Sequence, residues 1–292
     1  MENKNVLLVV NPISGSLDKT DIIGLVKTET DKLNAKLEIF QTTGEEDHFN
    51  LEKVIANIDP FRIIVAGGDG TIKIVAEALK GKKIPLGIIS AGSANGLAFN
   101  LQLPDKIEES IQVALQDNFI EMDIISINNE YCLHMSDLGL NAELIENFEN
   151  SSIRGKFGYL LQTIPTLAQS EYPFKFKIEA NNEIFEKEGI LLAIANAKSY
   201  GTGATINPEG KLDDGFFEIL ILKNLNMLQI LNTLRNETEL DPNFIEVIST
   251  KEAIITCNSK VAFQIDGEFL GKKDLVKTKI LPNKIKIAVP VI

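Results

Sequence analysis

Three glycines surround one carboxylate in the segment Gly67-Gly68-Asp69-Gly70, and these residue types suit phosphate binding. Glycine tolerates positive φ angles and lets a ligand approach the backbone closely. A helix that starts directly after such a turn points unpaired N–H groups and the positive end of its dipole at the same place. The segment therefore predicts a phosphate cradle.

Asp69 lies in the middle of this cradle, where its carboxylate would repel a bare phosphate anion. It therefore needs Mg²⁺, ordered water or a proton to share the space. This combination suggests metal-assisted phosphoryl transfer. The alternative is an ordinary strand-to-helix turn with an exposed aspartate, and GGDG by itself does not decide between the two.

Two segments of the second half also place carboxylates beside glycine, at residues 211–215 (KLDDG) and 264–268 (QIDGE). Carboxylates grouped with backbone carbonyls suit Mg²⁺, which prefers oxygen ligands and keeps several waters. A carboxylate within hydrogen-bond reach of an alcohol can accept its proton as a phosphoryl group moves. The alternative is that each Asp-Gly pair only forms a hairpin turn.

Length and composition indicate a folded protein of about two domains, because 292 residues are many for one core and 44% of them are hydrophobic. No apolar run approaches the roughly 18 residues that a membrane span needs. Residues 1–5 do not resemble a signal peptide. We therefore expect a cytoplasmic protein.

The residue types available exclude several chemistries. Cys132 and Cys257 lie far apart without metal-binding spacing, which predicts buried thiols in a reducing compartment. With only His48 and His134 present, neither a histidine-based zinc site nor a Ser-His-Asp triad is expected. Carboxylates, backbone amides and a hard cation must perform any chemistry.

The net charge of −12 argues against non-specific binding to nucleic acid. The charge is uneven, however, because residues 271–292 contain six lysines and the single acid Asp274. Such a basic strip can contact an anionic membrane surface. A strand edge protected by lysines explains the same pattern, so both interpretations remain open.

The glycine segment requires a strand before it and a helix after it. Residues 63–66 predict a buried strand, and the apolar residues between 72 and 79 recur at helical spacing. Strands at 6–10, 37–41 and 85–90 alternate with helices in the same way, which predicts a doubly wound parallel sheet. Its small-residue loops, at 11–15, 67–70 and 92–95, would then line one edge. Asp105 and Glu108 further suggest a capping box for the helix that follows them.

Near residue 120 the pattern changes to closely spaced strands with Asn-Asn turns, which predicts a mostly antiparallel β domain. We therefore expect a nucleotide-binding α/β domain at 1–120 and a β-sandwich domain at 121–292, with the alternative that the last strand or tail returns to the first domain. Two helices are expected at 158–168 and 227–234. The remaining predicted strands are 123–127, 131–135, 174–178, 189–195, 216–222, 253–257, 261–266 and 284–289.

Five motifs follow one another in a specific order: NPISG, GGDGT, PLGIISAGSANGLA, NAKSYGTGATINPEGKLDDGFFEI and QIDGEF. In this order they resemble the diacylglycerol kinase catalytic family, which includes bacterial lipid kinases, sphingosine kinases and ceramide kinases. The resemblance covers nearly the whole chain. It implies a lipid kinase with a nucleotide-binding domain related to NAD kinases and phosphofructokinases, a β-sandwich domain, and ATP, Mg²⁺ and lipid between them.

The resemblance also implies roles for individual residues. Asp69 would take part in the metal and water network, and Asp266, backed by Glu268, would be the general base for the lipid hydroxyl. Asp214 would hold Mg²⁺ with the carbonyls of Lys211 and Phe216, so that acids from both halves converge. The residues implied in nucleotide binding are Asn11, Ser14, Gly15, Thr42, Gly67, Gly68, Asp69, Gly70, Thr71, Gly92 and Ser93.

Two positions depart from the family pattern. Ile74 stands where the family usually has glutamate, and Gly96 stands where bacterial diacylglycerol kinases have aspartate. The lipid acceptor therefore stays open, and so does the efficiency of catalysis. Two alternatives follow: a kinase for a soluble small molecule, as in NAD kinases, or a nucleotide-binding regulator without turnover. The mode of membrane contact is also open, as is the oligomeric state, for which a homodimer is one option.

Overall fold

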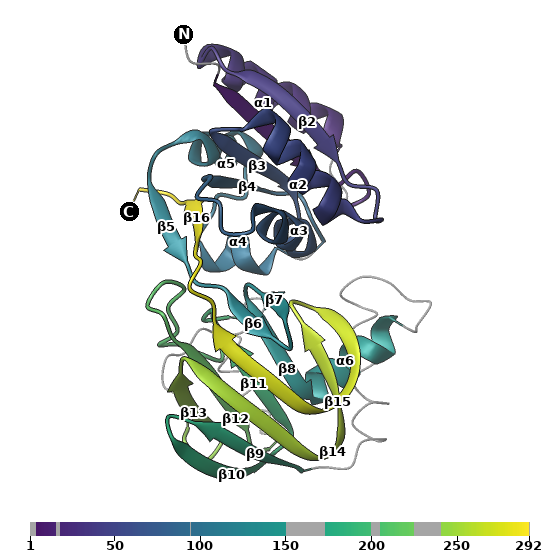
Figure 1. Ribbon diagram of the computed structural model, residues 1–292, viewed down its shortest axis with the longest axis vertical. Helices are drawn as coiled ribbons and strands as arrows, with labels where there is room; N and C mark the ends of the chain where they lie inside the picture. The colour runs from purple at the N-terminus through teal and green to yellow at the C-terminus, as the bar shows by residue number, and fades with distance from the viewer. Residues whose placement is uncertain are drawn as a thin grey trace. The chain divides into compact units, whose positions relative to one another are not determined.

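The computed structural model describes residues 4–15, 18–93, 95–149, 173–199, 205–224 and 241–291. The helices predicted at 158–168 and 227–234 lie outside these residues. The chain divides into two compact units (Figure 1). The first unit contains Met1–Asp123 and Pro282–Ile292, and the second contains Ile124–Leu281.

The first unit is built on a six-stranded sheet with the order β2-β1-β3-β4-β16-β5. Its strands are parallel except for β5, which pairs antiparallel with β16. The strands are β1 (Asn5–Val10), β2 (Lys36–Gln41), β3 (Arg62–Gly67), β4 (Leu86–Ser90), β5 (Phe119–Met122) and β16 (Ile285–Ala288). The helices are α1 (Lys19–Lys32), α2 (Asp47–Ile58), α3 (Asp69–Leu79), α4 (Gly96–Asn100) and α5 (Ile107–Leu115).

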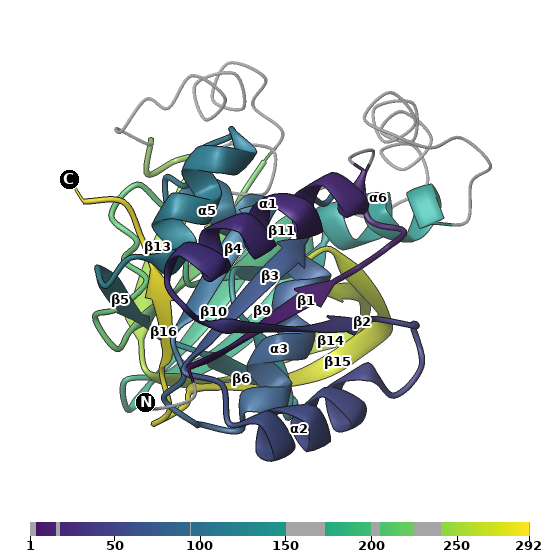
Figure 2. The ribbon, with the colours of Figure 1, turned by 90° about the horizontal axis from the view of Figure 1, so that it is seen from above.

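Helices cover both faces of this sheet, with α1 and α5 on one face and α2 and α3 on the other (Figure 2). On the first face, Val6 and Val10 of β1 pack in one apolar cluster with Ile22 and Val26 of α1. A parallel strand buried on both faces reads as a continuous apolar run, which explains the sequence of β1 and β3. The predicted doubly wound sheet is therefore confirmed.

The end of the chain returns to the first unit. Ile287 of β16 lies beside Leu86 of β4, and β16 pairs along its length with β5. The sheet therefore includes a strand from the last eleven residues of the chain, Pro282–Ile292.

Helix α5 does not begin with the expected capping box. Its N-cap is Lys106, whose side chain makes no capping hydrogen bond, and the helix starts at Ile107. Asp105 therefore lies one residue too early for its carboxylate to occupy the N-cap position. The Asp105/Glu108 prediction is wrong for this reason.

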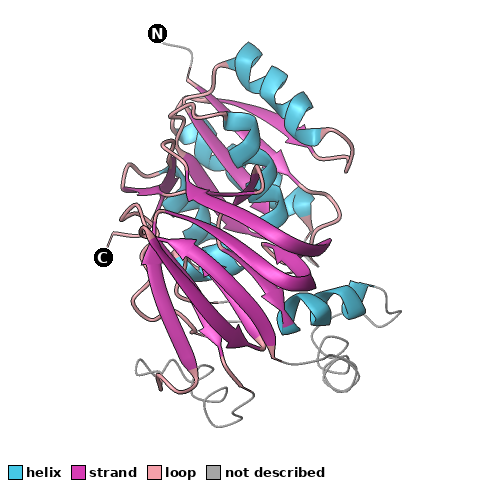
Figure 3. Cartoon of the chain, turned by 60° about the horizontal axis from the view of Figure 1, so that its bottom comes forward, coloured by secondary structure: helices cyan, strands magenta, loops and turns pink. Residues whose placement is uncertain are grey.

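The second unit consists mainly of a ten-stranded sheet whose strand pairs are all antiparallel (Figure 3). Helix α6 (Leu140–Glu149) follows β8. The strands are β6 (Ile125–Ile127), β7 (Glu130–Cys132), β8 (Met135–Gly139), β9 (Phe174–Ala180), β10 (Glu183–Gly189), β11 (Leu191–Ala195), β12 (Phe217–Leu222), β13 (Ile245–Thr250), β14 (Glu252–Ile265) and β15 (Glu268–Ile280).

Strand β14 organises this unit because it pairs with three neighbours. Its first half pairs with β9, its last three residues pair with β8, and β15 runs beside it for most of its length. The two strands predicted at 253–257 and 261–266 are thus one strand. A shift in register between Thr256 and Val261 absorbs the polar residues that suggested a break.

Side chains from both ends of the sheet pack into one apolar cluster, which includes Phe176 of β9, Phe217 of β12 and Phe263 of β14. The Asn-Asn hairpin turns are confirmed, since Asn128, Asn129 and the pair at 181–182 all have positive φ. The sequence prediction of an antiparallel β domain is therefore confirmed.

Both cysteines are buried thiols outside any disulfide, as predicted. Burial, helped by the nearby charge of Asp274, raises the pKa of the Cys257 thiol to about 12. Because the thiolate is the reactive form of cysteine, this shift lowers the reactivity of Cys257 at neutral pH.

Candidate functional site

The three small-residue loops of the first unit lie at one edge of its sheet. They follow β1, β3 and β4, which are adjacent parallel strands and therefore end on the same side. The chain passes from β1 to β2 on one side and then to β3 on the other. In open α/β sheets, ligands bind at the carboxyl ends of strands where the order reverses in this way.

Two glycines allow these loops to touch. A Cβ on Gly92 would lie 2.3 Å from the Cα of Gly68, and a Cβ on Gly15 would lie 2.6 Å from the carbonyl oxygen of Ala91. Gly15 also has a φ of +61°. No side chain fits at these two positions, so the loops after β1, β3 and β4 form one continuous backbone surface.

Asp69 is the first residue of α3 and is partly buried. Its Oδ2 accepts a hydrogen bond of 2.8 Å from the Gly96 N–H, and its Oδ1 accepts one of 3.0 Å from the Leu97 N–H. Gly96 and Leu97 begin α4, so the carboxylate caps a second helix. Asp69 therefore links the loop after β3 to the segment after β4, and it is more than an exposed turn residue.

Gly96, one of the two departures from the family pattern, has a defined place in this link. Its backbone N–H reaches the carboxylate of Asp69, and Asn95 closes the loop before it. The Asn95 amide accepts from the Gly92 N–H at 3.1 Å and donates to the Gly92 carbonyl at 3.2 Å. The contacts of Gly92, Asn95 and Gly96 thus form without a carboxylate at position 96.

The other residues predicted to bind nucleotide lie in or near these loops. Asn11 accepts a hydrogen bond from the Ile13 N–H, and its own N–H is bonded to Ala66 at the end of β3. The hydroxyl of Ser14 contacts the carbonyl of Ala91 at 3.2 Å. Thr42 follows β2 and Thr71 lies in α3, and both are buried, whereas Gly70 and Ser93 are exposed.

Lys19, which the sequence analysis did not single out, belongs to the same edge. Its side chain is only 8% exposed, and its ammonium donates to the carbonyl of Ser14 at 2.7 Å and to that of Ala91 at 3.1 Å. Burial lowers the pKa of Lys19, and the charge of Asp18 opposes this shift. A cation therefore lies between the loop after β1 and the loop after β4.

In the second unit, Asp266 occupies the tight turn between β14 and β15 with a φ of +51°. Its carboxylate accepts hydrogen bonds of 2.9, 2.9 and 3.1 Å from the N–H groups of Leu133, His134 and Met135. The thiol of Cys132 lies 3.6 Å from Oδ1. The proposed base is thus held firmly by the segment between β7 and β8.

A second network holds the same turn from inside the sheet. The amide oxygen of Gln264 accepts from the Gly267 N–H at 2.7 Å, and its amide nitrogen donates to the buried carboxylate of Asp137. Glu268, the first residue of β15, is exposed. Of the two predicted catalytic acids in this turn, Asp266 is therefore engaged by the backbone and Glu268 reaches solvent.

The predicted metal-binding segment forms an exposed turn. The Asp214 carboxylate accepts from the Phe216 N–H at 3.0 Å, Gly215 has a φ of +79°, and Lys211 is exposed. Among the described residues, no three His, Cys, Asp or Glu side chains gather as a metal site. One carboxylate with turn carbonyls fits a Mg²⁺ ion that keeps several waters and binds phosphate oxygens, but it does not form a closed protein site.

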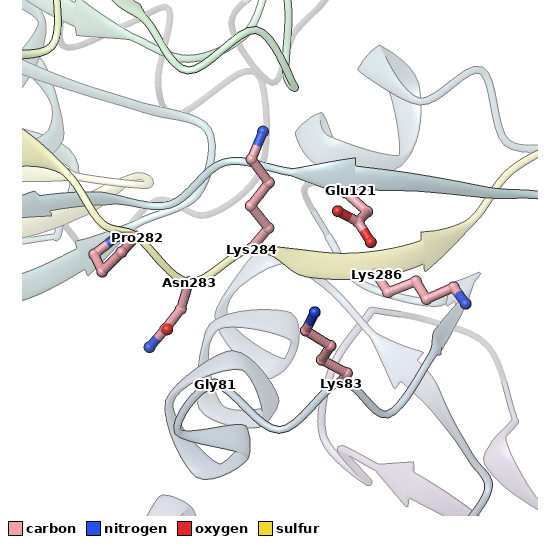
Figure 4. Close-up of a pocket in the computed structure, with 7 residues that line it drawn as sticks. All are labelled: Gly81, Lys83, Glu121, Pro282, Asn283, Lys284 and Lys286. Atoms are coloured by element: carbon pink, nitrogen blue, oxygen red, sulfur yellow. The ribbon is translucent and has the colours of Figure 1, made fainter.

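The first unit also contains a hollow of about 260 Å³ at the amino ends of β4 and β16, away from the glycine loops (Figure 4). Its charged lining residues are three lysines, Lys83, Lys284 and Lys286, and one acid, Glu121. Lys284 forms an ion pair of 2.9 Å with the buried Asp123, and Lys286 lies opposite Glu121 on β5 and over the Phe119 ring. The lining therefore carries more positive than negative charge.

The chain belongs to the diacylglycerol kinase family, and both of its units match domains of that family. Residues 5–127 match the diacylglycerol kinase catalytic domain, and residues 136–289 match the YegS C-terminal NAD kinase beta sandwich-like domain. The resemblance stated from the motifs is confirmed.

Individual proteins agree with this assignment. A diacylglycerol kinase of Staphylococcus saprophyticus is 26% identical over 279 residues, which cover 92% of this chain and 90% of that protein. A crystal structure of a diacylglycerol kinase from Bacillus anthracis matches 99% of this chain and 98% of its own, with a TM-score of 0.74 and 19% identity. An NAD kinase from Archaeoglobus fulgidus in complex with ATP matches 97% of this chain and 93% of its own, with a TM-score of 0.56 and 13% identity. At these identities the two structures establish the fold alone.

Proposed function

We propose that this protein is an ATP- and Mg²⁺-dependent lipid kinase that transfers the γ-phosphoryl group of ATP to the hydroxyl of a diacylglycerol-like or sphingoid-like lipid. The observation that carries the proposal is the glycine edge of the first unit, where three loops form one backbone surface at the switch point of the sheet. An NAD kinase of the same fold was crystallised in complex with ATP, which supports ATP as the nucleotide.

In this proposal the first unit binds the nucleotide and the second supplies the proton acceptor. Backbone N–H groups at the start of α3 bind phosphate oxygens, and Asp69 fixes the loops that present them. Asp214, with the carbonyls of Lys211 and Phe216, would hold Mg²⁺, which neutralises charge on the transferring phosphoryl group. The chain's own contribution is positioning and electrostatic stabilisation, because a loose phosphoryl transition state requires little covalent chemistry.

The hydrogen bonds of Asp266 sharpen the assignment of the general base. Its two oxygens already accept three backbone hydrogen bonds, whereas Glu268 is exposed two residues later. Asp266 positions the turn, and either it or Glu268 accepts the proton of the lipid hydroxyl. Glu268→Gln removes a base without disturbing the three bonds, so it separates the two roles.

The experiment is a transfer assay with purified protein, labelled ATP, Mg²⁺ and a total lipid extract, run beside an assay with soluble metabolites. We expect labelled lipid, with turnover reduced by about a hundredfold in Glu268→Gln if Glu268 is the base. If Glu268→Gln keeps normal turnover while folded Asp266→Asn loses it, Asp266 is the base. Neither assignment survives if both variants turn over normally.

The same assay tests the two alternatives. Transfer to a soluble metabolite and to no lipid would identify a small-molecule kinase, as the NAD kinase fold allows. Tight ATP binding without transfer to any acceptor would identify a nucleotide-binding regulator, for which Ile74 and Gly96 are the motivating departures.

A lipid substrate implies contact with a membrane surface, and we propose that the protein works from the cytoplasm at the inner face of the membrane. Within the residues described, no helix combines the length and apolar content that crossing a bilayer requires. Strand β15 carries Lys272, Lys273, Lys277 and Lys279, and only its last residues pair with β6 on the side away from β14. Sedimentation with anionic and with neutral vesicles tests this contact, and binding that ignores lipid charge would exclude a role for the lysines. A homodimer stays a prediction.

A further inference from the structure

The residues predicted to bind nucleotide provide no positively charged side chain to balance the charge of the phosphate groups. None of the eleven carries a positive charge, and Asp69 carries a negative one. Backbone N–H groups contribute only partial charges, whereas the phosphates of ATP carry several full negative charges. A positively charged side chain at the same edge, outside the predicted set, would therefore supply the full charge that these residues lack.

Lys19 is such a cation. It begins α1, and the carbonyls that its ammonium contacts belong to Ser14, in the loop after β1, and Ala91, directly after β4. Ser14 and Ala91 are 77 residues apart in the sequence. The Ala91 carbonyl also accepts from the Ser14 hydroxyl at 3.2 Å and lies against Gly15, so it is the point where the loops join.

The chemistry of this contact is unusual for a lysine. Lysine side chains are almost never fully buried unless paired, because removing an ammonium from water is costly. Here burial lowers the pKa of Lys19 against the opposing charge of Asp18, and its ammonium donates to the carbonyls of Ser14 and Ala91. A cation kept in a desolvated place raises the local positive potential, which water screens less than it screens an exposed charge.

We propose that Lys19 is a positioning residue of the nucleotide site: its ammonium joins the loop after β1 to the loop after β4 and provides positive potential for the phosphate groups of the bound nucleotide. This inference rests on the proposed function, since it assumes that the glycine edge binds ATP. It assigns Lys19 no contact with the nucleotide.

The proposal predicts a dependence on the number of phosphates. A purely structural lysine would affect the binding of every ligand at this edge to a similar degree. A lysine that contributes potential affects ATP most, ADP less, AMP still less, and adenosine hardly at all, because the Coulomb energy grows with the ligand's charge.

The experiment measures the dissociation constants of ATP, ADP, AMP and adenosine by calorimetry for the wild type and four variants. Lys19→Met removes the charge and the donors, Lys19→Gln keeps an N–H donor without charge, and Lys19→Arg keeps the charge. Lys27→Met is the matched control, because Lys27 is an exposed lysine of the same helix. Each variant is first checked for folding by its thermal unfolding midpoint.

We expect Lys19→Met and Lys19→Gln to weaken ATP binding by about tenfold or more, with a smaller loss for each phosphate removed. Lys19→Arg should recover part of the affinity for ATP, and Lys27→Met should bind as the wild type does. If Lys19→Met does not fold, Lys19→Gln and Lys19→Arg still separate charge from hydrogen bonding.

Equal losses for ATP and adenosine, or an ATP affinity unchanged in folded Lys19→Gln, would overturn the inference and leave the proposed function intact. A wild-type protein that binds none of the phosphorylated nucleotides would overturn both. These two failures are distinguishable because the second appears before any substitution is made.

Discussion

The glycine edge of the first unit and the Asp266 turn of the second are stabilised in opposite ways. At the glycine edge, backbones pack against each other so closely that no side chain fits at Gly15 or Gly92. At the Asp266 turn, one carboxylate collects three N–H groups from a segment more than 130 residues away. The first site depends on close contacts between backbones, whereas the second depends on hydrogen bonds made by side chains, above all that of Asp266.

This contrast predicts that, of the substitutions considered, Asp266→Ala causes the largest loss of stability. The substitution removes the acceptor of the Leu133, His134 and Met135 N–H groups, and we expect it to reduce the free energy of unfolding by about 4 kcal/mol. The midpoint of urea unfolding measures the loss. Asp274→Ala, at an exposed acid of the neighbouring strand, is the control and should change little.

A loss below about 1 kcal/mol in Asp266→Ala would contradict the contrast, because the turn would then be stable without its carboxylate. Activity is a separate readout, since an unstable protein loses turnover for either reason. Asp266→Asn, which keeps one acceptor oxygen, should fall between Asp266→Ala and the wild type in stability.

We expect the second-largest loss of stability for Gly92→Ala. The added Cβ would meet the backbone of Gly68 at 2.3 Å, and backbone moves less easily than the end of a flexible side chain. Overpacking of this kind costs about 1 to 3 kcal/mol, and we expect ATP binding to weaken with it. Thermal unfolding and calorimetric titration with ATP measure the two losses.

Gly70→Ala provides the control within the same site. An ideal Cβ at Gly70 meets nothing within 4 Å, and Gly70 lies in the first turn of α3. Alanine favours a helix over glycine by about 1 kcal/mol, so this variant should be at least as stable as the wild type. If Gly70→Ala and Gly92→Ala were equally destabilised, close packing of the loops would not explain the edge.

We expect the third-largest effect for Asp69→Ala, which should reduce the free energy of unfolding by about 2 kcal/mol. The reason is that two N–H groups at the start of α4 lose their acceptor. Asp69→Asn should lose about half as much, since its amide oxygen still accepts one of these bonds. The midpoint of urea unfolding orders the three proteins. If Asp69→Asn matched the wild type in stability and still lost turnover, the charge of Asp69 would serve catalysis rather than structure.

The sequence predicts local features of both sites well. The strand before Gly67, the helix after Asp69 and the turns at Asn128 and Asn181 all follow from residue types within a few positions of each other. Local propensity and turn chemistry are determined by such neighbours, so they can be read without knowing the fold.

The sequence does not predict the partners of the polar groups. Lys19 looks like an ordinary lysine near a helix start, and its contact with the carbonyl of Ala91 follows only from the fold. The partners of Asp266 lie in the segment predicted as one strand at 131–135, which the structure divides: β7 ends at Cys132 and β8 begins at Met135. Such pairings depend on the order of strands in the sheet, which propensity does not encode.

We expect the smallest change in stability for substitution of Asp214. Its carboxylate is exposed and accepts one bond from the Phe216 N–H within its own turn, so Asp214→Ala should change the free energy of unfolding by less than about 0.5 kcal/mol. If Asp214 binds Mg²⁺ as proposed, the same variant should require a higher Mg²⁺ concentration for half-maximal turnover, because one anionic ligand is missing. Titrating Mg²⁺ at constant ATP, beside thermal unfolding, separates these effects. An unchanged Mg²⁺ requirement would exclude Asp214 as a metal ligand, whereas a stability loss equal to that of Asp266→Ala would show that this turn, too, depends on its carboxylate.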